Sequence, residues 1–127
     1  MFQPDAVMQY VDDVEKSAAF YAALLDSQVQ QHGPGFALAR LADGRALGLW
    51  RRADVQPPVS AAPGTNELAM VVDNPEEVEQ LHARWKALGV TILLPPVTLG
   101  FGHTFVGEDL DGHRLRVYSR AQDLPPR

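Results

Sequence analysis

Two stretches of this 127-residue chain recur later in the same order. Residues 11–13 (VDD) match residues 72–74 (VDN), 61 positions later, and residues 43–50 (DGRALGLW) match residues 111–118 (DGHRLRVY), 68 positions later. The different spacings mean that several residues are inserted in the second copy. A chain of this length forms one domain or two half-size modules. Each module alone would expose an apolar sheet face, so we expect the two copies to pair.

Each copy contains the apolar pattern of a strand, a helix and three further strands. In the first copy the strands are expected at residues 7–11, 29–32, 36–41 and 46–50, with a helix at 14–25 capped by Asp12 or Asp13. In the second copy they are expected at residues 67–72, 90–94, 104–108 and 114–119, with a helix that begins after Asn74 and ends at Gly89. Residues 94–103 are rich in proline and glycine, which predicts a loop.

The sequence therefore predicts an α+β fold made of two paired β-α-β-β-β modules. The first module covers about residues 5–50 and the second about residues 67–119. The prolines of residues 51–66 predict a stiff connector between them. Residues 120–127 are expected to form a loose tail.

Composition excludes several classes of protein. The chain has no cysteine, which excludes disulfides, thiolate nucleophiles and cysteine zinc sites. Its formal net charge is −5 and its largest basic cluster is the pair Arg51–Arg52, so no nucleic-acid partner is expected. No apolar run approaches the roughly 18 residues of a membrane span, and the N-terminus lacks the pattern of a signal peptide. We therefore expect a cytoplasmic protein without a membrane partner.

Alternation along the expected strands separates two faces of each sheet. Leu47, Leu49, Leu115 and Val117 share an aliphatic face that a helix would cover. The opposite face mixes small, aromatic and charged side chains, among them Met8, Tyr10, Trp50, Glu67, Arg116 and Tyr118. Such a mixture favours the lining of a ligand cavity. The alternative is an open face toward solvent, where so many aromatic side chains would form an unusual patch.

Two motifs connect the repeat to a known family. Residues 10–21 (YVDDVEKSAAFY) open the first module, and residues 105–115 (FVGEDLDGHRL) close the second. Together with the paired modules they resemble the vicinal oxygen chelate superfamily, which includes glyoxalase I, extradiol dioxygenases, fosfomycin-modifying enzymes and bleomycin-resistance proteins. The resemblance implies a single domain over residues 1–127, a curved, cup-shaped mixed sheet with helices on its outer face, and a homodimer. It specifies the fold and leaves the reaction open.

The resemblance also indicates where a metal would bind. Enzymes of the superfamily hold a divalent ion through His or Glu on the first, fourth, fifth and eighth strands. The matching positions here are Ala6, Gly48, Glu67 and Arg116, and the repeat pairs the first with the third and the second with the fourth. Only Glu67 offers a ligand, whereas a metal enzyme of this type needs about three. No metal ion and no other cofactor is therefore predicted.

Glu67 and Arg116 would face each other at the vacated metal position, and we expect an ion pair there at the floor of the cavity. Such a pair either orients a polar group of a ligand or satisfies only itself. His103 lies in the loop before Thr104, a region that rims the cavity in binding members of the superfamily. It is either a polar loop residue or a hydrogen-bond donor or general base. Glu67 and His103 are candidates for catalysis, but no catalytic residue is assigned.

Three functional hypotheses follow. The first is a metal-free small-molecule binding protein of the glyoxalase/bleomycin-resistance type that sequesters a drug or metabolite and is not an enzyme. The second is a divalent-metal-dependent lyase or dioxygenase of the glyoxalase type, with ligands at other positions or from a partner chain. The third is metal-free acid–base catalysis by Glu67 or His103. The expected ligand-binding residues are Met8, Tyr10, Trp50, Glu67, Phe101, His103, Arg116 and Tyr118. The acidic chain suits a cationic ligand and Arg116 an anionic or carbonyl group, so the charge of the ligand stays open.

Overall fold

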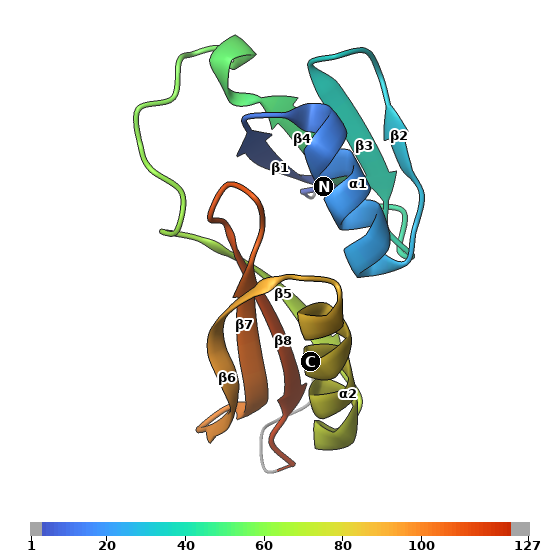
Figure 1. Cartoon of the computed structure of the whole chain (residues 1–127), viewed down its shortest axis with the longest axis vertical. Helices are drawn as coiled ribbons and strands as arrows, with labels where there is room; N and C mark the ends of the chain where they lie inside the picture. The colour runs from blue at the N-terminus through green and yellow to red at the C-terminus, as the bar shows by residue number, and fades with distance from the viewer. Residues whose placement is uncertain (1–3, 123–127) are drawn as a thin grey trace. The chain divides into compact units, whose positions relative to one another are not determined.

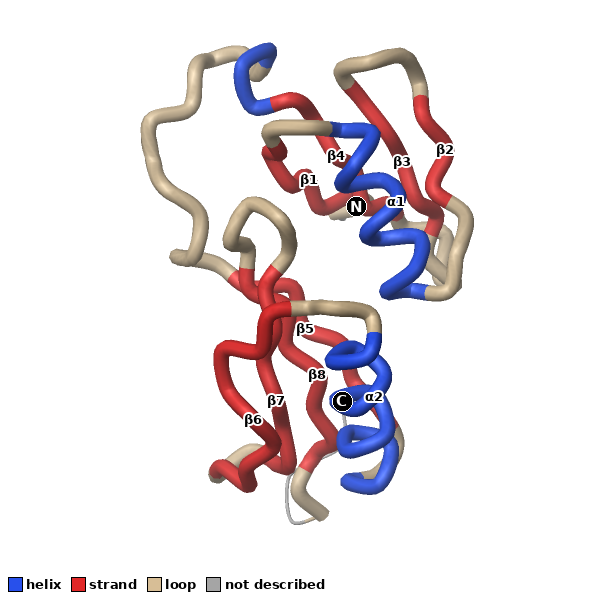
Figure 2. The backbone as a smooth tube through the Cα atoms, in the orientation of Figure 1, coloured by secondary structure: helices blue, strands red, loops and turns tan. Residues whose placement is uncertain are grey.

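The computed structural model describes residues 4–122 and divides into two compact units, Met1–Ala62 and Pro63–Arg127. The elements of the first unit are β1 (Ala6–Val11), α1 (Val14–Leu25), β2 (Val29–Gln31), β3 (Phe36–Arg40), β4 (Ala46–Arg51) and the short 3₁₀ helix η1 (Arg52–Asp54). The elements of the second unit are β5 (Glu67–Val72), α2 (Pro75–Ala87), β6 (Thr91–Leu99), β7 (Gly102–Glu108) and β8 (Arg114–Arg120). Each unit contains one α-helix beside a four-stranded sheet (Figure 1, Figure 2).

Both sheets have the same strand order, β1-β4-β3-β2 in the first unit and β5-β8-β7-β6 in the second. In each, the first strand runs parallel to the last strand of its module, and the other pairs are antiparallel. The two parallel pairs have the same register. Ala6 lies opposite Ala46, and their counterparts in the second copy, Glu67 and Arg114, also lie opposite each other. The predicted α+β fold of two β-α-β-β-β modules is confirmed. The cup-shaped sheet built by both modules together stays a prediction.

Both helices begin at predicted cap residues. Asp13 Oδ1 accepts a hydrogen bond from the Lys16 backbone N–H at 3.0 Å, so Asp13 rather than Asp12 caps α1. Asn74 Oδ1 accepts one from the Glu77 N–H at 2.9 Å and caps α2. Each cap satisfies one of the backbone donors that the first turn of a helix leaves without a partner. The caps thereby fix where each helix starts.

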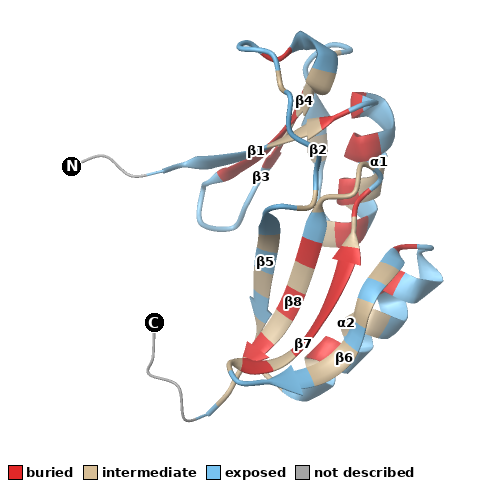
Figure 3. Cartoon of the chain, turned by 90° about the vertical axis from the view of Figure 1, so that its left-hand side faces the viewer, coloured by how far each residue is buried: buried red, intermediate tan, exposed pale blue. Residues whose placement is uncertain are grey.

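The core of the second unit lies between α2 and the sheet. Trp85 of α2 is 2% exposed and packs edge to face on Phe105 of β7, with 5.0 Å between the ring centroids. Buried and half-buried residues alternate along β8, as Figure 3 shows. The aliphatic residues predicted to face the helices are all buried: Leu47, Leu49, Leu115 and Val117.

The prediction of a loop at residues 94–103 is wrong. β6 continues to Leu99, and β7 already begins at Gly102. Pro95 and Pro96 lie inside β6, which is the edge strand of its sheet and whose register with β7 shifts twice. An edge strand tolerates residues without an N–H group, and bulges absorb the irregularity. The proline-rich stretch is therefore a long edge strand.

Smaller differences occur at the ends of strands. Arg51, predicted in the connector, closes β4, and Arg120, predicted in the tail, closes β8. The connector also contains η1, and residues 123–127 of the tail lie outside the described residues. Within residues 4–122, neither α-helix has the length and apolar run that crossing a membrane requires.

Candidate functional site

The candidate face of the second unit is set by the alternation of side chains along β8. The apolar residues of β8 are buried toward α2, whereas Arg116, Tyr118 and Arg120 lie on the opposite face and are half-buried. The parallel neighbour β5 contributes Glu67 and Ala69 to the same face, with Ala69 directly opposite Arg116. The pleat of two strands thus collects a carboxylate, two guanidinium groups and an aromatic ring on one surface.

Arg116 is held from three sides. Its Nε donates a hydrogen bond to Glu67 Oε2 at 2.7 Å, and its Nη1 donates one to Thr104 Oγ1 at 3.2 Å. Its Cζ lies 5.5 Å from the centroid of the Phe101 ring. Thr104 is itself fixed, since it is buried and its hydroxyl donates to the Val117 carbonyl at 2.8 Å. The predicted ion pair between Glu67 and Arg116 is present.

This ion pair is more exposed than the expected cavity floor. The side chain of Arg116 is 18% exposed and that of Glu67 is 37% exposed. Water therefore reaches the carboxylate, and the desolvation cost of a fully buried pair does not apply. A guanidinium carries five N–H groups. Two of those on Arg116 donate to Glu67 and Thr104, and the other three have no acceptor among the described residues.

An open hollow of about 440 Å³ lies over this face, and we call it the Arg116 hollow. It is lined by Glu67, Ala69, Phe101, Arg116, Tyr118 and Arg120. Phe101 and Tyr118 meet edge to face, with 5.8 Å between their ring centroids. Its lining contains two arginines and one glutamate, whereas the whole chain carries a net charge of −5. The hollow combines an aromatic wall with charged side chains.

The aromatic residues predicted in the first unit also gather. Tyr10 and Trp50 lie opposite each other in the β1–β4 pair and meet edge to face at 6.3 Å. The sulfur and methyl group of Met8 occupy the space that a Cβ at Gly48 would need. Phe36 of β3 borders the same space and was not among the predicted residues. Its position opposite Trp50 follows from the β3–β4 register, which the sequence pattern did not specify.

His103 lies on the α2 face of β7, away from the Arg116 hollow. Its Nε2 is 2.9 Å from Glu79 Oε2 on α2, and its Nδ1 is 2.9 Å from Thr98 Oγ1 on β6. The structure therefore does not bring His103 together with Arg116. Glu79, His103 and Thr98 thus form a hydrogen-bonded series of carboxylate, imidazole and hydroxyl. This is the order found where an oriented general base activates a hydroxyl. Sequence reasoning missed Glu79 and Thr98, since Thr98 reaches His103 only if β6 continues past its prolines.

The residues at the family metal positions do not fit a divalent ion. Ala6 and Gly48 offer no side-chain donor in the first unit. In the second unit, the carboxylate of Glu67 is bonded to Arg116, whose permanent positive charge opposes a neighbouring cation. Within the described part of the chain, no three His, Asp or Glu side chains gather closely enough to hold a metal. These four positions therefore do not supply the roughly three protein ligands that a divalent ion of this kind takes.

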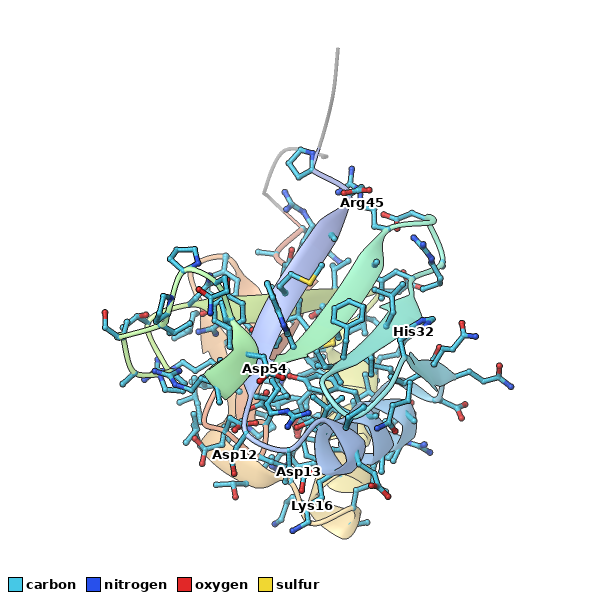
Figure 4. All side chains as sticks on the ribbon, turned by 90° about the horizontal axis from the view of Figure 1, so that it is seen from above. Asp12, Asp13, Lys16, His32, Arg45 and Asp54 are labelled. Atoms are coloured by element: carbon cyan, nitrogen blue, oxygen red, sulfur yellow. The ribbon has the colours of Figure 1, made fainter. Side chains whose placement is uncertain are left out.

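A second hollow, of about 280 Å³, lies at the start of α1 in the first unit. Asp13, which lines it, is engaged as the cap of α1, and Figure 4 shows it together with Asp12 and Lys16. Arg51, on the other side, pairs with Asp54 at 3.2 Å. Local capping and pairing account for these side chains, and we do not assign a site to this hollow.

Comparison with known proteins identifies the family. Residues 3–117 match the model of the Glyoxalase/Bleomycin resistance protein/Dioxygenase superfamily. The phenazine antibiotic resistance protein EhpR of Enterobacter agglomerans is 26% identical over 117 residues, which are 90% of this chain and 89% of that protein. A solution NMR structure of an Agrobacterium tumefaciens protein is 45% identical with a TM-score of 0.87 and covers 95% of this chain and 99% of its own. The crystal structure of a glyoxalase-related enzyme from Fulvimarina pelagi is 26% identical with a TM-score of 0.82 and covers 94% and 89%. The chain therefore belongs to the Glyoxalase/Bleomycin resistance protein/Dioxygenase superfamily.

Proposed function

We propose that this chain is a metal-independent binding protein for a small organic molecule, which it sequesters in the Arg116 hollow. The observation that carries the proposal is the arrangement of Arg116, held by Glu67, Thr104 and Phe101 with three N–H groups left for a ligand. A few placed polar groups beside aromatic side chains are the usual composition of a small-molecule site.

Binding without catalysis fits the residues of the hollow. Sequestration requires a shaped site and affinity, but no catalytic group. Glu67, the carboxylate that lines the hollow, is bonded to a guanidinium instead of a metal or a histidine. His103, the other candidate for catalysis, lies on the opposite face of the sheet.

The relatives point in two directions. One is named as a phenazine antibiotic resistance protein, and resistance by capture of the drug is compatible with a site that only binds. Another is described as a glyoxalase-related enzyme. Metal-dependent catalysis by this chain would require ligands that Ala6, Gly48 and Arg116 do not supply. We therefore favour a drug or metabolite as the captured molecule, with no metal involved.

We propose in addition that the chain forms a homodimer. Among the described residues, β1 and β5 each pair along one edge only. Val7 on β1 is 48% exposed and Val71 on β5 is 45% exposed. Native proteins cover or blunt open strand edges of this kind. Size-exclusion chromatography with light scattering tests the assembly: twice 13.9 kDa supports the dimer, and 13.9 kDa contradicts it.

Metal independence is tested by thermal unfolding of chelator-treated protein with Ni(II), Zn(II), Mn(II), Co(II) and, without oxygen, Fe(II) added singly. We expect no saturable shift. A ligand at about 100 times its Kd adds about 2.7 kcal/mol of stability, which would raise the Tm of a chain this size by several degrees. A saturable rise with one metal, at one ion per chain, would overturn metal independence and favour a lyase or dioxygenase.

Binding is tested by ¹H–¹⁵N NMR spectra of chelator-treated protein titrated with a fragment library. We expect a subset of fragments to shift the signals of Phe101, Arg116 and Tyr118. Arg116→Met should weaken the shifts of Phe101 and Tyr118, whereas the matched control Arg45→Met, at an exposed arginine of the first unit, should retain them. The function would be wrong if no fragment shifts these signals in the unsubstituted protein.

A further inference from the structure

We infer that the ligand of the Arg116 hollow is a planar aromatic molecule with an anionic group, such as an aromatic carboxylate. The inference rests on the proposed function and adds the chemical class of the ligand. Three features of the hollow carry it: the unused donors of Arg116, the charge of the lining, and the aromatic pair at its wall.

The first feature is a pre-positioned guanidinium. Glu67 holds Nε and Thr104 holds Nη1, so the side chain is fixed before any ligand arrives. The N–H groups without an acceptor among the described residues are the second one on Nη1 and the two on Nη2. A planar fork of donors matches the two oxygens of a carboxylate, and prior fixation reduces the entropy lost on binding.

The second feature is the charge of the lining. Arg116 and Arg120 bring two positive charges, and Glu67 brings one negative charge. The donors of Arg116 therefore favour an anion over a cation in the hollow. This local preference runs against the negative charge of the whole chain, which alone would favour cationic ligands.

The third feature is the aromatic wall. Phe101 and Tyr118 stand edge to face at 5.8 Å, and the Phe101 ring also lies against the guanidinium of Arg116. A flat ring stacked on either aromatic side chain places its substituent close to Arg116. The side chain of Ala69, opposite Arg116, is a single methyl group and therefore leaves space in the hollow beside the guanidinium. A volume of about 440 Å³ falls within the range of small-molecule pockets.

The experiment compares four probes that separate charge from ring character: 2-naphthoate, 2-naphthamide, 2-naphthylmethylammonium and decalin-2-carboxylate. Isothermal titration of chelator-treated protein measures each Kd. We expect 2-naphthoate to bind about tenfold or more tightly than the neutral amide, because hydrogen bonds to charged groups are the stronger kind. The ammonium probe should bind most weakly among the aromatic ones. The saturated carboxylate should bind more weakly than 2-naphthoate, since it lacks a π face.

Substitutions at two positions, Arg116 and Glu67, should change the affinity for 2-naphthoate in opposite directions, which a purely structural role would not produce. Arg116→Met should remove the preference for 2-naphthoate over the amide, and Arg116→Lys should keep part of it because the charge remains while the fork is lost. Glu67→Gln should tighten 2-naphthoate by about threefold, since the amide oxygen can still accept from Arg116 Nε while a like charge worth a fraction of a kcal/mol beside the anion is removed. Arg45→Met in the first unit is the matched control and should leave all four Kd values unchanged.

The outcomes separate this inference from the proposed function. Equal or tighter binding of the amide or the ammonium probe would overturn the anionic class, while fragment binding at the hollow would still support the function. Equal binding of the saturated carboxylate would overturn the aromatic class. If none of the four probes binds but other fragments shift Phe101 and Tyr118, the inference fails alone. If no fragment shifts them, both fail.

Discussion

The ion pair between Glu67 and Arg116 should contribute measurably to stability, and a matched pair in the first unit provides the reference. Its Nε–Oε2 distance is 2.7 Å, and its side chains are 37% and 18% exposed. The pair of Arg45 and Asp43 is 3.6 Å apart, with side chains 55% and 60% exposed. Exposed pairs contribute about 0.2–1 kcal/mol. We therefore expect a coupling free energy of about 1 kcal/mol for the first pair and about 0.2 kcal/mol for the second.

The coupling is measured by a double-mutant cycle with Glu67→Gln, Arg116→Met and the double variant, and by the equivalent cycle at Asp43 and Arg45. A cycle is needed because Arg116→Met alone also loses the hydrogen bond to Thr104 and the contact with Phe101. Urea unfolding gives each free energy, and about 1 kcal/mol corresponds to a Tm shift of about 4 °C for a chain of this size.

Salt provides an independent check of the same pair. The Debye length falls to about 3 Å at 1 M salt, so the coupling of the half-exposed pair should decrease there. The reasoning would be refuted by a Glu67–Arg116 coupling no larger than that of Asp43–Arg45. A coupling that 1 M salt leaves unchanged would refute its electrostatic origin.

Three further substitutions test the framework that positions the hollow. Phe105→Ala should lower the free energy of unfolding by about 3–5 kcal/mol in urea titrations, because the ring is fully buried and packs on Trp85; a loss below about 1 kcal/mol would contradict this packing. Asn74→Ala should cost about 1 kcal/mol by removing the cap of α2, whereas Asn74→Asp, measured in the same way, should retain most of the stability. Gly102→Ala should cost about 2 kcal/mol or more, since its φ of 148° disfavours a side chain and a Cβ there would collide with the Ser119 carbonyl; an unchanged urea midpoint would contradict the geometry of β7.

Most of the fold could be predicted because the sequence contains two copies of the same module. The matches at residues 11–13 and 43–50 fixed the order of the elements, and alternation along each strand fixed which face a helix covers. The error at residues 94–103 has a physical cause. Proline predicts a loop from local preferences, but a strand at the edge of a sheet has no partner for half of its N–H groups and accepts proline there. Whether a strand lies at an edge is a property of the whole sheet.

The candidate site could be predicted only in part. The positions that match the family's metal ligands predicted that Glu67 and Arg116 face each other, and their ion pair was found. Thr104 could not be identified as the second partner of Arg116, because that contact depends on the β7–β8 register. The position of His103 depends on the same hairpin, since a residue at the edge of a loop can point to either face. With β7 beginning at Gly102, its side chain turns toward α2.

The positions that match the family's metal ligands hold different side chains in the two units, and the difference supports the proposal that the second unit holds the binding site. In the first unit, Gly48 is covered by the side chain of Met8, which leaves only apolar contact. In the second, Arg116 occupies the equivalent position and brings a fixed charge with unused donors. Both sheets share one strand order and the register of their parallel pairs, so the fold does not account for this contrast; the side chains do. A ligand recognised by charge must therefore depend on Arg116, whereas a ligand recognised by apolar contact alone would bind Arg116→Met as tightly as the unsubstituted protein.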